Sequence, residues 1–487
     1  MKMTKMNEKL FHKTFSFFFR IGLCLFVFAA VTPSARADEG TAASAPSDIA
    51  SAVSAVDPAV PAATTAESSS QGSGSFLGNA WSNVKKTVKN GVSLGNAGGF
   101  QPRVRPHLHG ESSWNSNSNL GRSNSGAWEG RLSPGVTLDL PFGDKLYGQV
   151  GYNYTYSTTQ GPRISTHTNS HTIDAMLRYD ATAKTAMGIK NSTRWNEMPG
   201  QPGNMFFLET LTPEVRHKFG TQLSTGLQYI YQHYSDITSS SSGTQTDFFR
   251  SAITNDSFTD HGVVATSQYE VSKRLSLGPN FDWHVRRFSK TESKDYWQIQ
   301  PTLGATYQLG PKTKLGGHFG WAYRRFDVGD GYESELVYGA HINHLLSRKL
   351  VWGLSYNKSL TDTFDTSFVF DPISPEASNL DNFDRHFRVI KSHRIGTTLA
   401  YNINEKNSVG GNFDFQASSA DNNDNVVSND RMNEKKIETG VYYLHRLTKY
   451  ISLKLGYAFG RSFVAEDNPS RSQYTFHKII AGVNVAF

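Results

Sequence analysis

Histidine, serine and asparagine side chains gather in one short stretch, "HGESSWNSNSNLGR", at residues 109–122. A serine nucleophile, a histidine base and a residue that orients the histidine are the groups that acyl hydrolysis needs. The histidine and the serine must also share a strand face, two residues apart, to form a hydrogen bond. Here a glycine and a glutamate separate His109 from Ser112 and Ser113, so no serine lies two residues away. We therefore predict that the protein is not an enzyme.

Two histidine pairs have a spacing that suits metal binding. His107 and His109 share a strand face, and so do His167 and His171 if that stretch is extended. A zinc site needs further ligands from neighbouring strands, and the sequence shows no such set. Residues 420–430 offer oxygen ligands for calcium without the EF-hand spacing, so we interpret them as a solvated loop. We expect water-facing histidines, no metal and no cofactor.

The elements that position these side chains are alternating strands, which begin at about residue 103. In residues 275–285, apolar residues occupy every second position, and serine, glycine, asparagine, aspartate and histidine occupy the others. Charged residues and glycines cannot fill the dry core between two packed sheets. We therefore expect one face of the strands to meet lipid and the other to meet water.

One unit repeats along the chain: an alternating strand that ends on an outward tyrosine, a short turn with lysine or arginine, and a second strand. The tyrosines of five such units are Tyr179, Tyr269, Tyr307, Tyr401 and Tyr443. Longer polar connections separate the units. Short turns on one side and long loops on the other are typical of outer-membrane barrels, and aromatic residues near both strand ends predict two interfacial belts.

The pattern predicts an all-β fold: a closed antiparallel transmembrane β-barrel of eighteen strands, with sixteen as the alternative count. An even number returns the chain to the side on which it started. The predicted strands span residues 103–114, 127–140, 146–158, 168–180, 185–195, 206–217, 222–235, 259–271, 275–289, 294–309, 314–328, 333–346, 350–361, 387–403, 407–418, 430–445, 450–462 and 472–487.

The N-terminal part of the chain has a different composition. Residues 1–37 combine basic residues, the apolar run "IGLCLFVFAAV" and the small-x-small site "ARA", which is typical of a signal peptide. Residues 38–75 are rich in Ala, Ser, Pro and Thr, and we expect them to be disordered. Residues 76–102 are predicted to hold a short amphipathic helix and a linker, before a barrel at 103–487.

Charge and cysteine content exclude other classes of protein. The 487 residues carry a formal net charge of +7, but most of this excess lies in the predicted signal peptide. The basic balance therefore gives no case for nucleic acid as a partner. The one cysteine, Cys24, also lies in the signal peptide, so the mature protein would have no disulfide.

The chain ends on "IAGVNVAF", another alternating segment. Here the sequence resembles bacterial outer-membrane β-barrel proteins, because Gly482, Val485 and Phe487 match their C-terminal assembly signal, whereas Ile480 replaces its usual polar residue. The resemblance implies a place in the outer membrane of a Gram-negative bacterium after signal-peptide cleavage. Outer-membrane lipid, lipopolysaccharide and the barrel-assembly machinery would be its partners. The strand count and the N-terminal tail resemble β-barrel porins associated with exopolysaccharide secretion.

The water-facing side of the predicted strands carries more positive than negative charge. The predicted lumen-lining residues are Arg103, Arg105, His107, His109, Arg131, Arg178, Arg194, Arg216, His284, Arg286, His318, Arg324, Arg394, Lys454 and Lys478. Eighteen strands enclose more space than their own side chains fill, which predicts a channel for hydrophilic solutes. We expect a conduit for polysaccharide export. The alternatives are a general or anion-preferring uptake porin, a structural barrel that docks periplasmic partners, and charges that only hydrate the wall and hold the strands in register.

The cleavage site gives a first test. Mature protein isolated from outer membranes should begin at Asp38 or within a few residues of it, because "ARA" is the one good cleavage site near the apolar run. N-terminal sequencing measures this, and mature protein that still begins at Met1 would contradict the predicted export.

Overall fold

The computed structural model describes residues 92–93, 102–117, 126–161, 164–197, 204–238, 257–289, 295–327, 332–362, 389–421, 432–464 and 474–486. The chain divides into one unit of residues 1–60 and another of residues 61–487, and every described residue belongs to the second. The predicted signal peptide, the low-complexity segment, most of the predicted amphipathic helix and Phe487 lie outside the described residues. Within the described part of the chain, no helix is long and apolar enough to cross a membrane.

The described secondary structure consists of β-strands. These are β1 (Val92–Ser93), β2 (Arg103–Asn115), β3 (Ala127–Phe142), β4 (Leu146–Gly161), β5 (Ile164–Asp180), β6 (Thr185–Glu197), β7 (Asn204–Phe219), β8 (Leu223–Thr238), β9 (Phe258–Glu270), β10 (Leu275–Phe288), β11 (Tyr296–Gly310), β12 (Thr313–Phe326), β13 (Tyr332–Leu345), β14 (Leu350–Asp362), β15 (Val389–Asn402), β16 (Asn407–Asp421), β17 (Met432–Arg446), β18 (Ile451–Val464) and β19 (Tyr474–Ala486). Each predicted strand overlaps one of β2–β19, so the count of eighteen barrel strands is confirmed and sixteen is wrong. The two-residue β1 lies within residues 76–102, the predicted helix and linker.

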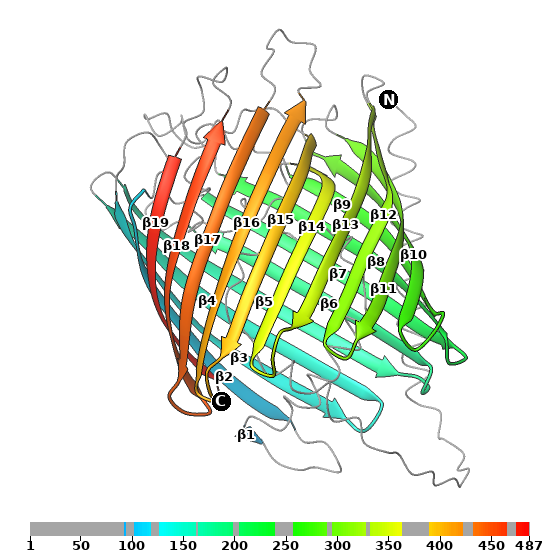
Figure 1. The fold of residues 1–487 in the computed structure, drawn as a ribbon, viewed down its shortest axis with the longest axis horizontal. Coiled ribbons are helices and arrows are strands. Elements are labelled where there is room, and N and C mark those ends of the chain that lie inside the picture. Colours follow the sequence, from blue (N-terminus) through cyan, green and yellow to red (C-terminus); the bar gives the residue numbers. More distant parts are fainter. Residues whose placement is uncertain are drawn as a thin grey trace. The chain divides into compact units, whose positions relative to one another are not determined.

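Strands β2–β19 form one closed antiparallel barrel (Figure 1). Each strand pairs with its neighbours in the sequence, and the last pairs with the first through Lys478–Ala486 of β19 and His107–Asn115 of β2. A closed ring gives the backbone N–H and C=O groups of every strand partners within the wall. Closure therefore satisfies the main condition for strands to cross a membrane.

The pairings also determine the width of the barrel. Following paired residues once round the wall from Glu111 returns to β2 about 22 residues farther along the chain. With ordinary strand spacings, that stagger tilts the strands by about 40° and places the backbone about 18 Å from the barrel axis. A side chain on the wall is too short to reach the axis from that distance.

One kind of turn recurs at the end of the barrel where the connections are short. In it, a Ser, Thr or Asn side chain accepts hydrogen bonds from backbone N–H groups two and three residues later. Thr182 does so from Lys184 and Thr185, at 3.1 and 3.0 Å. The same arrangement occurs at Ser272, Asn404 and Thr448. These capped turns explain how the repeated unit reverses direction within a few residues.

The short strand β1 lies beside the start of β2. β19 pairs with β2 only from His107 onward, whereas Val92 and Ser93 of β1 pair with Val104 and Arg103. β1 thus occupies the position beside β2 that the end of β19 leaves open. It shortens the free strand edge at the closing seam, where an unpaired edge would attract other strands.

The closed sheet separates its side chains into an apolar outer face and a polar inner face. Directly opposite residues share a face, and the pairs Phe281–Pro301 and Asp282–Gln300 lie on alternate faces. The outer face exposes large apolar residues such as Phe319, which is 60% exposed. The inner face buries charged groups such as Arg324, because a concave wall crowds its side chains together.

A designed disulfide tests the closure of β19 on β2. Leu108 and Val485 are directly opposite on the outer face, so the double variant Leu108→Cys/Val485→Cys should form an intramolecular disulfide in the folded barrel. Outside the predicted signal peptide, the sequence has no other cysteine to compete. The crosslinked chain should migrate faster than the reduced chain on a denaturing gel.

The control is Leu108→Cys/Val441→Cys, because Val441 lies on β17, which does not pair with β2. A crosslink of equal yield in the control, or none in the test variant, would contradict the closure.

Candidate functional site

The candidate functional site is the inner wall of the barrel, the face that carries Arg105, Glu111, Asp282 and Arg286. The strand pairings place all the predicted lumen-lining residues on this face: Arg103, Arg105, His107, His109, Arg131, Arg178, Arg194, Arg216, His284, Arg286, His318, Arg324, Arg394, Lys454 and Lys478. Whether they line an open lumen and contact a solute stays a prediction.

Asp139 is the centre of one polar cluster on the inner wall. Its side chain is fully buried and accepts hydrogen bonds from three neighbouring residues. Arg105 of β2 donates to both carboxylate oxygens at 2.6 and 2.8 Å, and Tyr147 and Gln149 of β4 donate at 2.7 and 3.0 Å. The cluster joins β2, β3 and β4, so the charge of Arg105 is used to hold strands together.

Ion pairs also connect the strands on either side of the closing seam. Lys478 of β19 reaches past β2 to Glu129 of β3, with Nζ 2.6 Å from Oε2. Lys454 of β18 reaches past β19 to Glu111 of β2, at 3.7 Å. Gly482 lies between Lys454 and Glu111 in the pairing and has no side chain to obstruct that contact. Each pair therefore joins two strands that do not pair with each other.

A denser charged cluster lies on β9 and β10. The imidazole of His284 lies between two carboxylates, with Nδ1 3.2 Å from Asp260 and Nε2 2.6 Å from Asp282. Arg286 donates to the second oxygen of Asp260 at 3.1 and 2.7 Å. The side chains of Arg286 and Asp260 are only 4% and 7% exposed. This pair is thus shielded from water, and neither charge can lose its partner without a large cost.

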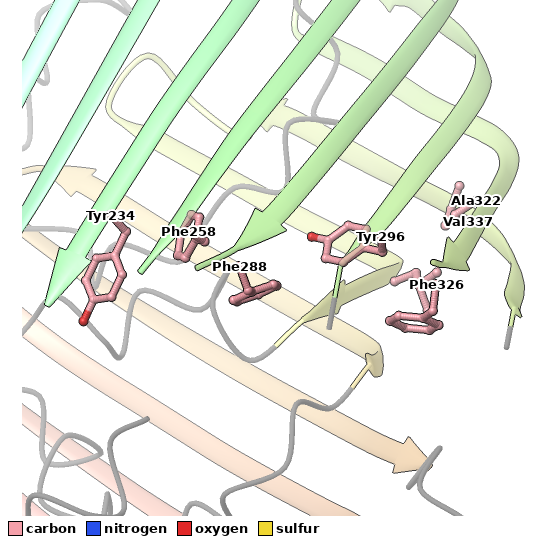
Figure 2. Close-up of a cluster of buried hydrophobic side chains, with 8 residues drawn as sticks. Tyr234, Phe258, Phe288, Tyr296, Ala322, Phe326 and Val337 are labelled. Atoms are coloured by element: carbon pink, nitrogen blue, oxygen red, sulfur yellow. The ribbon is translucent and has the colours of Figure 1, made fainter. Parts of the chain in front are cut away.

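The cluster is flanked by aromatic rings that also face inward, from β8–β12 (Figure 2). The Arg286 guanidinium carbon lies 4.5 Å from the Phe258 ring centroid, and that of Arg324 lies 4.2 Å from the Tyr296 centroid. Phe258 also contacts Phe288, and Tyr296 contacts Phe326. These rings hold the two arginines by cation–π contact.

These inward aromatics differ from the prediction that aromatic residues near strand ends belong to the outer belts. The alternation itself contained the signal, since Phe288 is two residues from Arg286 and must share its face. Asp180 and Asp260 also face inward, and their carboxylates offset part of the positive charge of the inner wall.

Four inner-wall histidines lie over glycines of the neighbouring strand: His107, His284, His318 and His341. A Cβ added at Gly262 would be 2.4 Å from the His284 ring, and one added at Gly339 would be 2.5 Å from the His318 ring. A side chain at either position would displace the imidazole. The glycines on the water-facing side therefore make room for rings.

The expectation that His167 and His171 face water inside the barrel is wrong. The stretch is extended, as the spacing required, but His171 is opposite Tyr154 on the outer face. Its ring stacks on Trp195 at 4.8 Å and its Nδ1 lies 2.9 Å from the Tyr152 hydroxyl. Both histidines belong to the aromatic belt near the long connections, where a polar ring edge is compatible with the membrane interface.

The residues considered for hydrolysis do not assemble into a catalytic set among the described side chains. Ser113 donates its hydrogen bond to Glu129 at 3.2 Å, and Ser112 lies on the outer face opposite Gly130. His109 has Glu111 as its nearest charged partner, at 4.0 Å. The described residues also contain no group of three potential metal ligands. Residues 422–430 of the acidic loop lie outside the described part of the chain.

Four inner-wall cations differ from those in the clusters. Arg103, Arg131, Arg216 and Lys314 form no ion pair among the described contacts, and all remain at least partly exposed. Arg394, by contrast, contacts Asp414 at 2.6 Å. The inner wall therefore has cations that join strands and cations whose charge remains available to an anion.

Comparison with protein families finds one match. Residues 100–278, which span β2 to the start of β10, match the family described as "Putative beta-barrel porin 2". This part of the chain thus resembles β-barrel porins, and the association with exopolysaccharide secretion stays a prediction. No curated protein matches the chain.

Solved barrels are also similar in structure. Pseudomonas aeruginosa OpdQ is 13% identical, with a TM-score of 0.44 over 79% of this chain and 99% of its own. P. aeruginosa OpdL is 13% identical, with a TM-score of 0.42 over 79% and 98%. The FrpB iron transporter from Neisseria meningitidis is 9% identical, with a TM-score of 0.45 over 79% and 81%.

The buried cluster gives a stability prediction. Asp260→Asn should lower the free energy of unfolding by about 3 kcal/mol, because it removes the buried carboxylate charge that contacts both Arg286 and His284. Urea unfolding of the refolded barrel in lipid vesicles measures this value.

Asp414→Asn is the matched control, because its ion pair with Arg394 has side chains 22% and 35% exposed. Water can replace that partner, so the loss should stay below about 1 kcal/mol. Equal losses in the two variants would show that the cluster on β9 and β10 has no special role in stability.

Proposed function

We propose that the protein is a channel through which hydrophilic solutes cross the outer membrane. The observation that carries the proposal is the closed wall of eighteen strands, whose radius of about 18 Å exceeds the reach of its own side chains. A wall with an apolar outside and a polar inside separates lipid from water.

The proposed location is the outer membrane, reached after removal of the signal peptide. Its support is the predicted signal sequence, the turn arrangement and the similarity of residues 100–278 to a β-barrel porin family. In barrels of this kind the short turns face the periplasm and the long connections face outward. The end with β1 and the capped turns would then be the periplasmic end.

The proposed cargo is an anionic or strongly hydroxylated solute, with polysaccharide export as the preferred function and anion-preferring uptake as the alternative. Its support is the set of inner-wall cations that form no ion pair with the described residues: Arg103, Arg131, Arg216 and Lys314. Arg105 and Arg286 are engaged with buried carboxylates, so we assign them to strand cohesion. The proposed selectivity therefore depends on a minority of the inner-wall cations.

Charge removal at these positions tests the proposal. In a planar bilayer with a salt gradient, the wild-type pore should prefer anions. The variant Arg103→Gln/Arg131→Gln/Arg216→Gln/Lys314→Gln should move the reversal potential toward zero. The difference should grow as salt falls, because the screening length of about 8 Å at physiological salt lengthens. Glutamine keeps hydrogen bonding and leaves the buried pairs intact.

The control removes four cations from the short turns, as Lys184→Gln/Arg274→Gln/Arg348→Gln/Lys449→Gln. It changes the net charge equally but leaves the inner wall unchanged, so the reversal potential should stay at the wild-type value. A cation-selective wild type, or two variants with the same potential, would mean that these charges only hydrate the wall.

A further inference from the structure

Three exposed basic side chains, two of them cationic, lie close together on the outer face of the barrel, next to the closing seam. They are Lys435 of β17, Arg461 of β18 and His477 of β19, and we call them the basic patch. The pairings place them among outer-face residues, since Lys435 is opposite Phe463 and His477 is opposite Phe459. Cations on the face that meets lipid need an explanation, because they are costly there without an anionic partner.

The basic patch lies at the end of the barrel with the long connections. Arg461 is near the end of β18, and Lys435 and His477 are near the starts of β17 and β19. Below them, toward the short turns, the outer face continues with Tyr457 and Ile479, which are 41% and 58% exposed. The patch thus lies at the level of the lipid headgroups, above an apolar surface for acyl chains.

Specific contacts hold two residues of the basic patch, His477 and Arg461, in place. The Nδ1 of His477 lies 2.7 Å from the Tyr457 hydroxyl, and the Phe459 ring lies 5.2 Å from the imidazole. The backbone N–H of His477 also donates to Ser116 at 2.8 Å. With Nδ1 engaged, Nε2 lies on the opposite edge of the ring. The guanidinium of Arg461 packs over the Phe463 ring, 4.6 Å from its centroid.

The patch has no negative charge beside it within the described wall. On β17–β19, the residues that face outward in the pairings include no aspartate or glutamate. The three side chains of the patch also form no ion pair among the described contacts. Elsewhere on the outer face, Arg287 forms an ion pair with Asp327. Outer-face cations of this barrel therefore do not all lack a carboxylate partner.

A comparison within the barrel separates the patch from the ordinary aromatic belt. The same contacts between tyrosine, a second ring and histidine occur at Tyr229, Tyr231 and His261. The next outer-face positions there are His233 and Thr259, and the one arginine beside them, Arg287 opposite Thr259, is paired with Asp327. The histidine arrangement thus belongs to the belt, and Lys435 and Arg461 distinguish the patch.

We infer that the basic patch binds the phosphate groups of a phosphorylated glycolipid, the lipopolysaccharide of the outer leaflet. A phosphate oxygen can accept charge-assisted hydrogen bonds from the guanidinium and the ammonium, and a further one from Nε2 of His477. The inference rests on the proposed function, because only an outer-membrane barrel with its long connections outward brings the patch to that leaflet.

Lipid binding by the folded full-length mature protein in detergent tests the inference. Native mass spectrometry would compare bisphosphorylated lipid A with the same lipid after phosphate removal. The wild type should retain the phosphorylated form in clear preference. Lys435→Gln/Arg461→Gln/His477→Gln should weaken its binding by about tenfold or more, and bind both forms similarly.

The matched control is His445→Gln/Arg446→Gln/Lys449→Gln, which removes the same residue types from β17 and its turn at the other end of the barrel. It should bind phosphorylated lipid as the wild type does. Heat-modifiable gel mobility verifies folding of each variant, and Arg461→Gln alone serves if the triple variant does not fold. Equal binding by patch and control variants, or equal binding of both lipid forms by the wild type, would overturn the inference.

The outcome is separable from that of the proposed channel. Conductance in a bilayer of phosphate-free lipid does not require the patch. A barrel that conducts but shows no phosphate preference would contradict the lipid site alone, and one that binds the lipid but passes no current would contradict the channel alone.

Discussion

Backbone hydrogen bonding inside a membrane is the constraint on which the rest of this structure depends. No water is present in the hydrocarbon region to satisfy a free strand edge, so a sheet that crosses it must close. The pairing of β19 with β2 provides this closure, and the stagger of the strands then determines the width of the wall. Width and closure together produce an inner surface that the chain can line but cannot fill. The channel proposal follows from this geometry.

Closure also explains how charge is distributed on the inner wall. Some cations hold strands together, as Lys454 and Lys478 do across the seam and Arg286 does on β10. Others, such as Arg131 and Lys314, have no ion pair among the described residues and remain for an anion. The mixed charges therefore have two roles: one set of residues holds the strands in register, and another set could attract an anionic solute. The outer face follows the same logic, since its cations need either a carboxylate of the chain or an anion of the membrane.

The number of strands, their bounds within a few residues and the separation of faces could be predicted from the sequence, because alternation and turn residues are local properties. In residues 275–285 the alternation alone gives both faces correctly. His167 and His171 were predicted on the wrong face. They are separated from the inward-facing Asp174 and Arg178 by odd numbers of residues, which places them on the opposite face. The contact of Arg286 with Asp260 could not be predicted from the sequence, because it depends on the register between strands. β1 was missed because two residues contain no periodicity.

The central claim is that the inner wall encloses an open, water-filled conduit. Single-channel conductance of the purified barrel, recorded with neutral polymers of increasing size, measures this most directly. The account predicts stepwise currents that fall when small polymers enter and recover once the polymers are too large to enter the pore. A folded barrel that inserts into the bilayer but passes no current would contradict this claim. A current that does not depend on polymer size would also contradict it.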